Sequence, residues 1–273
     1  MKKSILLWLI AFILSAFTAI YQRITGPTYP VSGEIILNQK MIEYKLDRAH
    51  AGEGDHPIEF DVDDEKVRGK LLWRRFNTDD EWNSVEMINR DGKLISSLPH
   101  QPPAGKLLYK IILKKNNEAV TLPNEGGVII RFKGEVPLLF LIPHIIFIFG
   151  AMLLSTRTGL EYFNNGRNFK SLTLFTFIFV IIGGFILGPI AQYYAFGEFW
   201  TGFPIGYDLT DNKILIGFIC WLIALIALYR FKNPRRWIIF ASIIMFIIFL
   251  IPHSLLGSEL DYKKLEKQSI EHR

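Results

Sequence analysis

The sequence predicts an α+β membrane protein, in which an extracytoplasmic antiparallel β-sandwich of Ig-like size is inserted between an N-terminal signal-anchor helix and a four-helix transmembrane bundle. Hydrophobic residues make up 50% of the 273 residues and charged residues 21%, so we expect apolar and polar segments to alternate. Residues 21–136 hold 17 Lys and Arg against 18 Asp and Glu, as in a soluble domain, whereas long apolar runs dominate the rest. The predicted boundaries are 1–21 for the anchor, 22–136 for the β domain, 137–256 for the bundle and 257–273 for an extracytoplasmic C-terminal tail.

The first predicted element is the anchor helix. Lys2 and Lys3 precede an apolar run from Ser4 to Ile20. This run is longer than the core of about 7–15 residues that a cleaved signal peptide needs. We therefore expect the helix to be retained, with cleavage after Thr18 as the alternative.

The segments that follow the anchor are short and rich in β-branched and aromatic residues, with Gly, Pro, Asn and Asp between them. Many short strands without a helical pattern between them indicate an antiparallel sandwich of about 100 residues. The stretch LPHQPPAGKLLYKIIL resembles the corner before a late strand of Ig-like folds, but the paired cysteines of antibody domains are missing. The predicted strands are Ser32–Leu37, Met41–Leu46, Ile58–Val62, Val67–Arg75, Ser84–Ile88, Leu94–Ser97, Leu107–Leu113, Ala119–Leu122 and Val128–Phe132.

Two polar loops of the β domain carry ionisable side chains. His50 and His56 flank a Gly-rich loop. We expect them to be solvated, and a metal site is the alternative. The acidic run from Asp79 to Glu81 lies between two predicted strands, which favours a hairpin with cross-strand charge pairs.

Four apolar spans follow Pro137, each long enough to cross or nearly cross a hydrocarbon layer of about 30 Å. Basic residues gather in two of the connections, at Arg157–Lys170 and at Arg230–Arg236. Because basic loops stay inside, these connections and the N-terminus are expected to be cytoplasmic, with the β domain and the C-terminus outside. We therefore expect a multi-pass protein of a bacterial cytoplasmic membrane. The predicted spans are Leu138–Leu154, Leu172–Tyr194, Ile214–Tyr229 and Trp237–Leu256.

Charge and cysteine content limit the partners. The isoelectric point near 9.1 comes from the short basic segments beside the spans, so a nucleic acid partner is not expected. The single cysteine, Cys220, excludes an intrachain disulfide and a cysteine-based metal centre. The expected partners are the lipid bilayer and an envelope protein that contacts the β domain.

A repeated tetrapeptide suggests a site in the outer half of the bundle. The sequence LIPH ends at His144 in the first span of the bundle and at His253 in the last. Counting about 1.5 Å per residue places His144 about 9 Å below the outer surface and His253 about 24 Å above the inner one. Ionisable side chains at such depth suggest function, and neutral imidazole is a ligand for haem iron and for transition metals.

A polar loop between two spans lies at the same predicted surface. It runs from Phe196 to Lys213 and could supply further ligands to the two histidines. The alternatives are structural, because Thr210 or Asp211 could cap the next helix and each histidine could bond to a carbonyl freed by its proline. The candidate site therefore comprises His144, His253, Gln192, Tyr207, Asp208, Asp211 and Asn212, with His144 and His253 as the metal ligands.

The span before this loop contains Gly184 and Gly188 in a GxxxG pattern. Such a pair favours close helix packing, with room for a planar cofactor as the alternative. Motifs for a catalytic triad, a phosphate-binding loop or a dinucleotide site are absent from the sequence. Whether the chain is an enzyme therefore stays open.

Two functions remain as hypotheses. The first is an envelope membrane protein that displays the β domain as a binding or assembly module. The second is a membrane-embedded redox protein with haem or a transition metal at the outer face of the bundle. Transport is a weaker third option, because the spans hold few charged groups.

Overall fold

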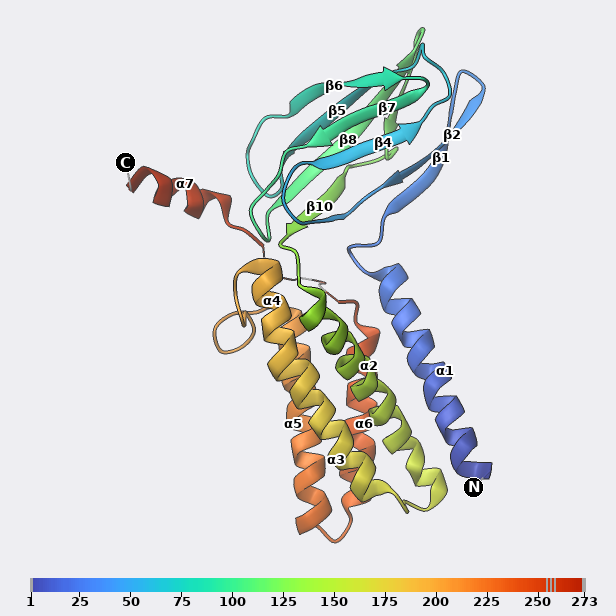
Figure 1. Cartoon of the computed structure of the whole chain (residues 1–273), viewed down its shortest axis with the longest axis vertical. Helices are drawn as coiled ribbons and strands as arrows, with labels where there is room; N and C mark the ends of the chain where they lie inside the picture. The colour runs from blue at the N-terminus through green and yellow to red at the C-terminus, as the bar shows by residue number, and fades with distance from the viewer. Residues whose placement is uncertain (1, 254, 256, 258, 272–273) are drawn as a thin grey trace. The chain divides into compact units, whose positions relative to one another are not determined.

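The computed structural model describes residues 2–253, 255, 257 and 259–271 (Figure 1). The chain forms two compact units. One consists of residues 2–27 and the described part of 136–257, and the other of residues 28–135 and 259–271. The first unit is helical, and the second is a β domain to which a C-terminal helix belongs.

The helical unit consists of long apolar helices joined by short turns. Four stretches are long and apolar enough to cross a membrane: Lys2–Thr25, Leu138–Asn164, Phe169–Phe196 and Leu209–Arg230. The last helix is also apolar but has only 17 residues, and it begins with Pro234, which needs no hydrogen-bond partner at that position. The elements are α1 (Lys2–Thr25), α2 (Leu138–Leu160), the 3₁₀ turn η1 (Glu161–Asn164), α3 (Phe169–Val180), η2 (Ile181–Leu187), α4 (Gly188–Phe196), α5 (Leu209–Arg230) and α6 (Pro234–Leu250).

The third of these stretches, α3–η2–α4, contains a π-helical segment, η2, at its two adjacent glycines. A Cβ atom on Gly183 would lie 2.9 Å from the backbone nitrogen of Ile148 in α2. A Cβ atom on Gly184 would lie 2.6 Å from a methyl carbon of Ile214 in α5. Gly184 belongs to the GxxxG pattern and allows the close helix packing that was its leading interpretation, and Gly183, outside the pattern, adds a second close approach.

Small side chains also line the core of the helical unit. Ala151, Ala224 and Ala241 are buried together with Trp221 and Met245. Ala151 lies on α2, Ala224 on α5 and Ala241 on α6. Their small side chains leave room in this cluster for the large Trp221 ring of α5. Many large apolar side chains point outward from these helices instead, as expected where the surroundings are lipid.

The sequence interpretation of Arg157 was wrong. We expected the first span of the bundle to end at Leu154 and Arg157 to lie in a connection. Instead α2 continues to Leu160, and the Arg157 side chain is 1% exposed. One turn later, Glu161 is 0% exposed, and its Oε2 lies 2.6 Å from Nη1 of Arg157. The carboxylate neutralises the guanidinium, so the helix need not end before it.

The β domain is a single curved sheet, so the expected two-sheet, Ig-like sandwich was wrong. Its eight strands follow the order β3-β10-β8-β5-β6-β7-β4, with β9 also paired to β8, and they curl into a nearly closed barrel (Figure 1). A separate hairpin, β1–β2, packs its buried residues into the same core. The strands are β1 (Val31–Leu37), β2 (Lys40–Leu46), β3 (Ala49–Ala51), β4 (His56–Asp61), β5 (Arg68–Arg75), β6 (Asn83–Arg90), β7 (Lys93–Leu98), β8 (Lys106–Lys115), β9 (Glu118–Leu122) and β10 (Val128–Lys133).

Strand pairing, rather than strand pattern, distinguishes the barrel from a sandwich. Every second residue of β4 and β8 is buried, and this alternation is the same in both architectures because each buries one face of a sheet. The longest strand, β8, pairs with β5 and also with β9 and β10, which makes the sheet continuous. The pair β10–β3 is parallel, so the antiparallel expectation was wrong at this one position.

The predicted acidic hairpin is confirmed. Strands β5 and β6 are antiparallel, and Lys70 stands opposite Glu86 in their register. The Lys70 ammonium lies 3.7 Å from the Glu86 carboxylate. In the connection, Asp80 pairs with Arg75 at the end of β5.

The two end strands of the barrel meet at a pair of histidines, and this region is the seam. His50 lies on β3 and His56 begins β4. The expectation that both histidines are solvated was wrong, because the structure places His56 at 7% exposure and His50 at half-burial. Nearby, the buried Tyr109 hydroxyl donates to the backbone oxygen of Asp47 at 2.8 Å, and burial raises the pKa of this phenol.

Candidate functional site

The polar loop predicted as part of the site is held in place by Asp211. This buried carboxylate lies in the first turn of α5, where the helix dipole favours a negative charge. Its Oδ2 accepts hydrogen bonds from the backbone N–H of Thr201 at 2.7 Å, from the Thr201 hydroxyl at 3.2 Å and from Nε2 of Gln192 at 3.1 Å. Asp211 therefore fastens the loop to α4 and α5, and we call these three residues the Asp211 cluster.

The other predicted loop residues have local roles. Asp208 is the N-cap of α5, and its Oδ1 accepts from the Thr210 N–H at 2.8 Å. The sequence analysis expected Thr210 or Asp211 to cap this helix, whereas the cap is Asp208. Asn212 accepts from the Phe203 N–H at 2.7 Å, which holds the loop at a second point two residues after Thr201. Tyr207 is 93% exposed.

Two residues that the sequence analysis missed bind the end of α6. Lys213 is buried, and its ammonium donates to the carbonyl of Ile251 at 3.0 Å and to that of Pro252 at 3.3 Å. Gln22 of α1 donates to the Ile251 carbonyl at 3.3 Å and also to the Phe249 carbonyl. These contacts satisfy carbonyls that a helix C-terminus leaves without intrahelical partners, and they place a positive charge at the negative end of the helix dipole.

The two candidate histidines occupy different settings. His144 lies in α2, and its Nδ1 is 3.0 Å from the carbonyl oxygen of Gly183 in the π-helical segment. His253 is exposed and follows α6, which ends at Leu250 rather than continuing to Leu256 as expected. Among the described residues, no group of three or more His, Cys, Asp or Glu side chains is arranged to hold a metal ion. The shared site of His144 and His253 therefore stays a prediction.

A second buried polar group surrounds the ion pair of Arg157 and Glu161. The Glu161 Oε1 accepts from the Asn164 side chain at 2.9 Å and from the Asn168 N–H at 3.0 Å. The Arg157 guanidinium lies 5.4 Å from the centre of the Trp8 ring in α1. The pair thus ties the turn between α2 and α3 together and contacts α1, which is distant in the sequence.

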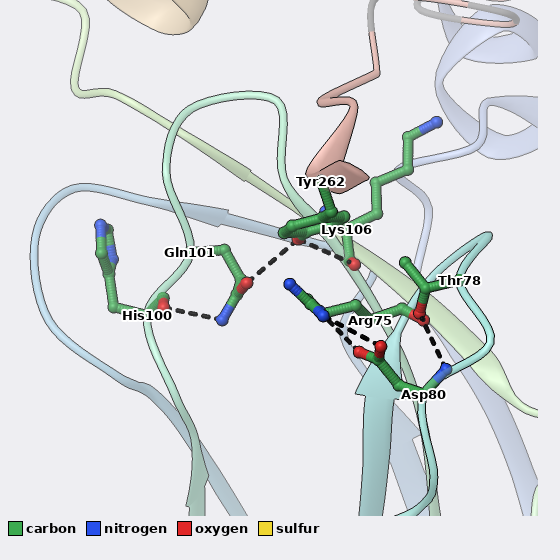
Figure 2. Close-up of polar contacts among 7 residues, drawn as sticks. All are labelled: Arg75, Thr78, Asp80, His100, Gln101, Lys106 and Tyr262. Atoms are coloured by element: carbon green, nitrogen blue, oxygen red, sulfur yellow. Dashed lines mark hydrogen bonds and ion pairs between the residues drawn. The ribbon is translucent and has the colours of Figure 1, made fainter. Parts of the chain in front are cut away.

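The C-terminal segment is fastened to the β domain by Tyr262, at the start of α7 (Tyr262–Glu271) (Figure 2). The buried Tyr262 hydroxyl accepts from the Lys106 N–H at 3.0 Å and donates to Oε1 of Gln101 at 3.0 Å. Figure 2 shows Arg75 beside the ring, with its guanidinium carbon 5.1 Å from the ring centre, and Asp80 binding that guanidinium. We call this contact the Tyr262 anchor.

Charges and backbone atoms reinforce the Tyr262 anchor. The Lys106 ammonium lies 2.6 Å from the Glu259 carboxylate, and the Leu260 N–H donates to the Ala104 carbonyl at 3.2 Å. The hydrogen bond from Arg75 lowers the pKa of the Asp80 carboxyl, and burial raises the pKa of Tyr262 to about 12. The tail thus forms part of the β domain.

Comparison with protein-family models gives no match, and comparison with curated proteins gives none either.

Proposed function

We propose that the chain is a multi-pass membrane protein that displays its β domain outside the cytoplasmic membrane, as a binding or assembly module of the cell envelope. The Tyr262 anchor carries this proposal. The chain leaves the β domain at β10, passes through α2 to α6, and returns to the same domain at Tyr262. A chain that starts and ends on one side of a membrane crosses it an even number of times.

This parity supports α6 as a crossing helix. Three stretches after the β domain, Leu138–Asn164, Phe169–Phe196 and Leu209–Arg230, are long enough to cross, so a fourth crossing is needed. The 17 residues of α6 span about 26 Å at 1.5 Å per residue, which is close to the thickness of the hydrocarbon layer. Lys213 and Gln22, which bind the carbonyls beyond α6, reduce the cost of ending the helix near that layer.

The orientation follows from the basic residues. Lys2 and Lys3 stand at one end of α1. Arg167 lies in the connection after α2, Lys170 in the first turn of α3, and Lys232 in the connection after α5. All of these fall on one side when each helix crosses once. By the positive-inside rule this side is the cytoplasm, and the β domain lies on the other.

Reporter fusions test this topology. Alkaline phosphatase, which is active only outside, should be active when fused at the C-terminus and inactive when fused after Arg235. A fluorescent protein that folds only in the cytoplasm should give the opposite pattern. Phosphatase activity of the Arg235 fusion, or its absence from the C-terminal fusion, would contradict the proposed five crossings, which are α1 and the four helical stretches after the β domain.

The binding role is supported by an exposed apolar pair on the outer face of the β1–β2 hairpin. Ile36 and Met41 stand opposite each other in the register and are 70% and 59% exposed. Contiguous exposed apolar side chains can mark an interaction surface, and this cross-strand pair is the position at which we test for one. A photo-reactive amino acid at Ile36 should cross-link an envelope protein in cells, and one at the exposed Glu59 of β4 should not. Equal cross-linking at both positions would contradict a binding surface on the hairpin.

The alternative function is a redox protein with haem or a transition metal between His144 and His253. It rests on the repeated LIPH sequence and on the depth of the two histidines. The absorption spectrum and the metal content of the purified protein test it. A Soret band or a stoichiometric metal that is lost in both His144→Ala and His253→Ala would support this alternative.

A further inference from the structure

Two histidine nitrogens converge at the seam of the β domain. The Nδ1 atoms of His50 and His56 lie 3.2 Å apart. The two rings are inclined by 66° with their centres 5.0 Å apart, so they meet through their nitrogens rather than by stacking. The buried Phe132 ring lies against His50, at 5.4 Å between ring centres, and limits its rotation.

The opposite nitrogen of each ring faces an oxygen. Nε2 of His50 lies 3.2 Å from the Gly54 carbonyl oxygen, which can only accept a hydrogen bond. Nε2 of His56 lies 4.0 Å from a carboxylate oxygen of Asp47, which also favours a proton on the nitrogen. A neutral imidazole with its proton on Nε2 carries a lone pair on Nδ1. Two lone pairs at 3.2 Å repel each other unless a positively charged centre lies between them.

We propose that His50 and His56 bind one transition-metal ion, of the class of Zn²⁺, through their Nδ1 atoms. Zn–N bonds of about 2.0–2.1 Å at a tetrahedral angle place two ligating nitrogens about 3.3 Å apart, close to the observed separation. Histidines that bind metals usually donate their other N–H to a carbonyl or a carboxylate. The Gly54 carbonyl is at hydrogen-bond distance from Nε2 of His50, and the Asp47 carboxylate, at 4.0 Å, acts on Nε2 of His56 through its charge. Water completes the coordination on the half-exposed side of His50.

The ion would join the two end strands of the barrel. His50 lies on β3 and His56 on β4, and only the short 52–55 connection links these strands in sequence. An ion held by both histidines therefore stabilises the closed form of the β domain over an opened one. The competing arrangement is a hydrogen bond between the two Nδ1 atoms. In the neutral pair it turns the lone pair of one Nε2 atom toward the Gly54 carbonyl or the Asp47 carboxylate, whereas a pair with one protonated ring satisfies every nitrogen without a metal, and zinc titration distinguishes these states from the metal site.

Zinc titration of the full-length protein tests the proposal. The protein is purified in detergent through a tag without histidine, treated with a chelator, and titrated with ZnCl₂ by calorimetry. One equivalent of Zn²⁺ should bind at the seam. His50→Ala and His56→Ala should each abolish this binding, whereas His100→Ala and His253→Ala should retain it.

A conservative variant separates a binding role from a role in folding. Asp47→Asn keeps both histidines and nearly the same volume, and it should weaken Zn²⁺ binding by about tenfold, as is common when the partner of a ligating histidine is changed. Circular dichroism of each zinc-free variant shows whether the β domain is still folded. The proposal is overturned if the wild-type protein binds no zinc, or if binding survives unchanged in folded His50→Ala.

Discussion

At the scale of single residues, the buried charges explain most of what the sequence did not reveal. Arg157 lies inside a helix that periodicity alone would end at Leu154, because its partner Glu161 is also buried. Lys213 was assigned to a loop, yet its ammonium binds backbone carbonyls beyond the end of α6. The i,i+4 spacing of Arg157 and Glu161 is visible in the sequence, but the burial of the pair is not. Lys213 and the Ile251 carbonyl are 38 residues apart, and only the tertiary fold brings them together.

The first prediction concerns this ion pair. Glu161→Leu leaves the Arg157 guanidinium buried without its partner and should reduce the free energy of unfolding by about 3–5 kcal/mol. The double variant Arg157→Leu and Glu161→Leu removes both charges and should recover most of that loss. Thermal unfolding in detergent measures both effects, with Leu at the exposed Arg167 as the control. Additive losses in the double variant would show that the two side chains do not interact.

The second prediction concerns the pH dependence of the Tyr262 anchor. The pKa of Tyr262 is raised from 10.0 to about 12, because burial disfavours the phenolate. The contribution of the neutral phenol to stability is therefore complete below pH 10 and is lost as the pH rises to 12 and above. The difference in tyrosinate absorbance between the wild-type protein and Tyr262→Phe should show one group that titrates near pH 12. A difference curve centred at pH 10 would mean that the anchor is not formed.

At the scale of elements, sequence periodicity located the apolar helices and nine of the ten strands, since each buries one face or stripe of side chains. It missed β3, because three residues carry too little pattern. It also could not separate a barrel from a sandwich, because alternation reports which side chains are buried and not which strand lies beside which. Of the candidate site, Asp211 and Gln192 were found to lie together, through loop contacts that a pattern cannot specify.

The third prediction concerns the end of α6. Lys213→Met removes the donors to the carbonyls of Ile251 and Pro252 while keeping a long side chain. Hydrogen bonds from charged groups contribute about 1.5–3 kcal/mol, so the melting temperature in detergent should fall clearly. Lys232→Met, at an exposed position after α5, should leave it unchanged. Equal melting temperatures for the two variants would contradict a role for Lys213 in holding this end.

At the scale of the whole molecule, the β domain comprises residues from two distant parts of the chain. The strands come from 28–135, and the anchoring segment from 259–271. The sequence predicted a C-terminal tail from residue 257. In the structure, residues 259–271 belong to the β domain. The chain in between is apolar and helical, and its return to the same β domain is the basis for the proposed even number of membrane crossings after that domain.

The fourth prediction tests this division. A protein of residues 28–135 should fold as a soluble β-rich monomer, because the buried core lies within it. A peptide of residues 259–271 should bind it and raise its melting temperature, and the same peptide with Tyr262→Ala should not. An equal effect of both peptides would show that Tyr262 does not anchor the segment.

The central claim is that the β domain and the C-terminal segment lie outside the membrane while the basic connections lie inside. Labelling of intact cells with a membrane-impermeant maleimide tests it directly, once Cys220 is replaced by serine. Single cysteines at Glu53 and Lys264 should be labelled, and those at Arg167 and Lys232 should be labelled only after the cells are broken. Labelling of Arg167→Cys in intact cells, or protection of Glu53→Cys, would contradict the proposed orientation.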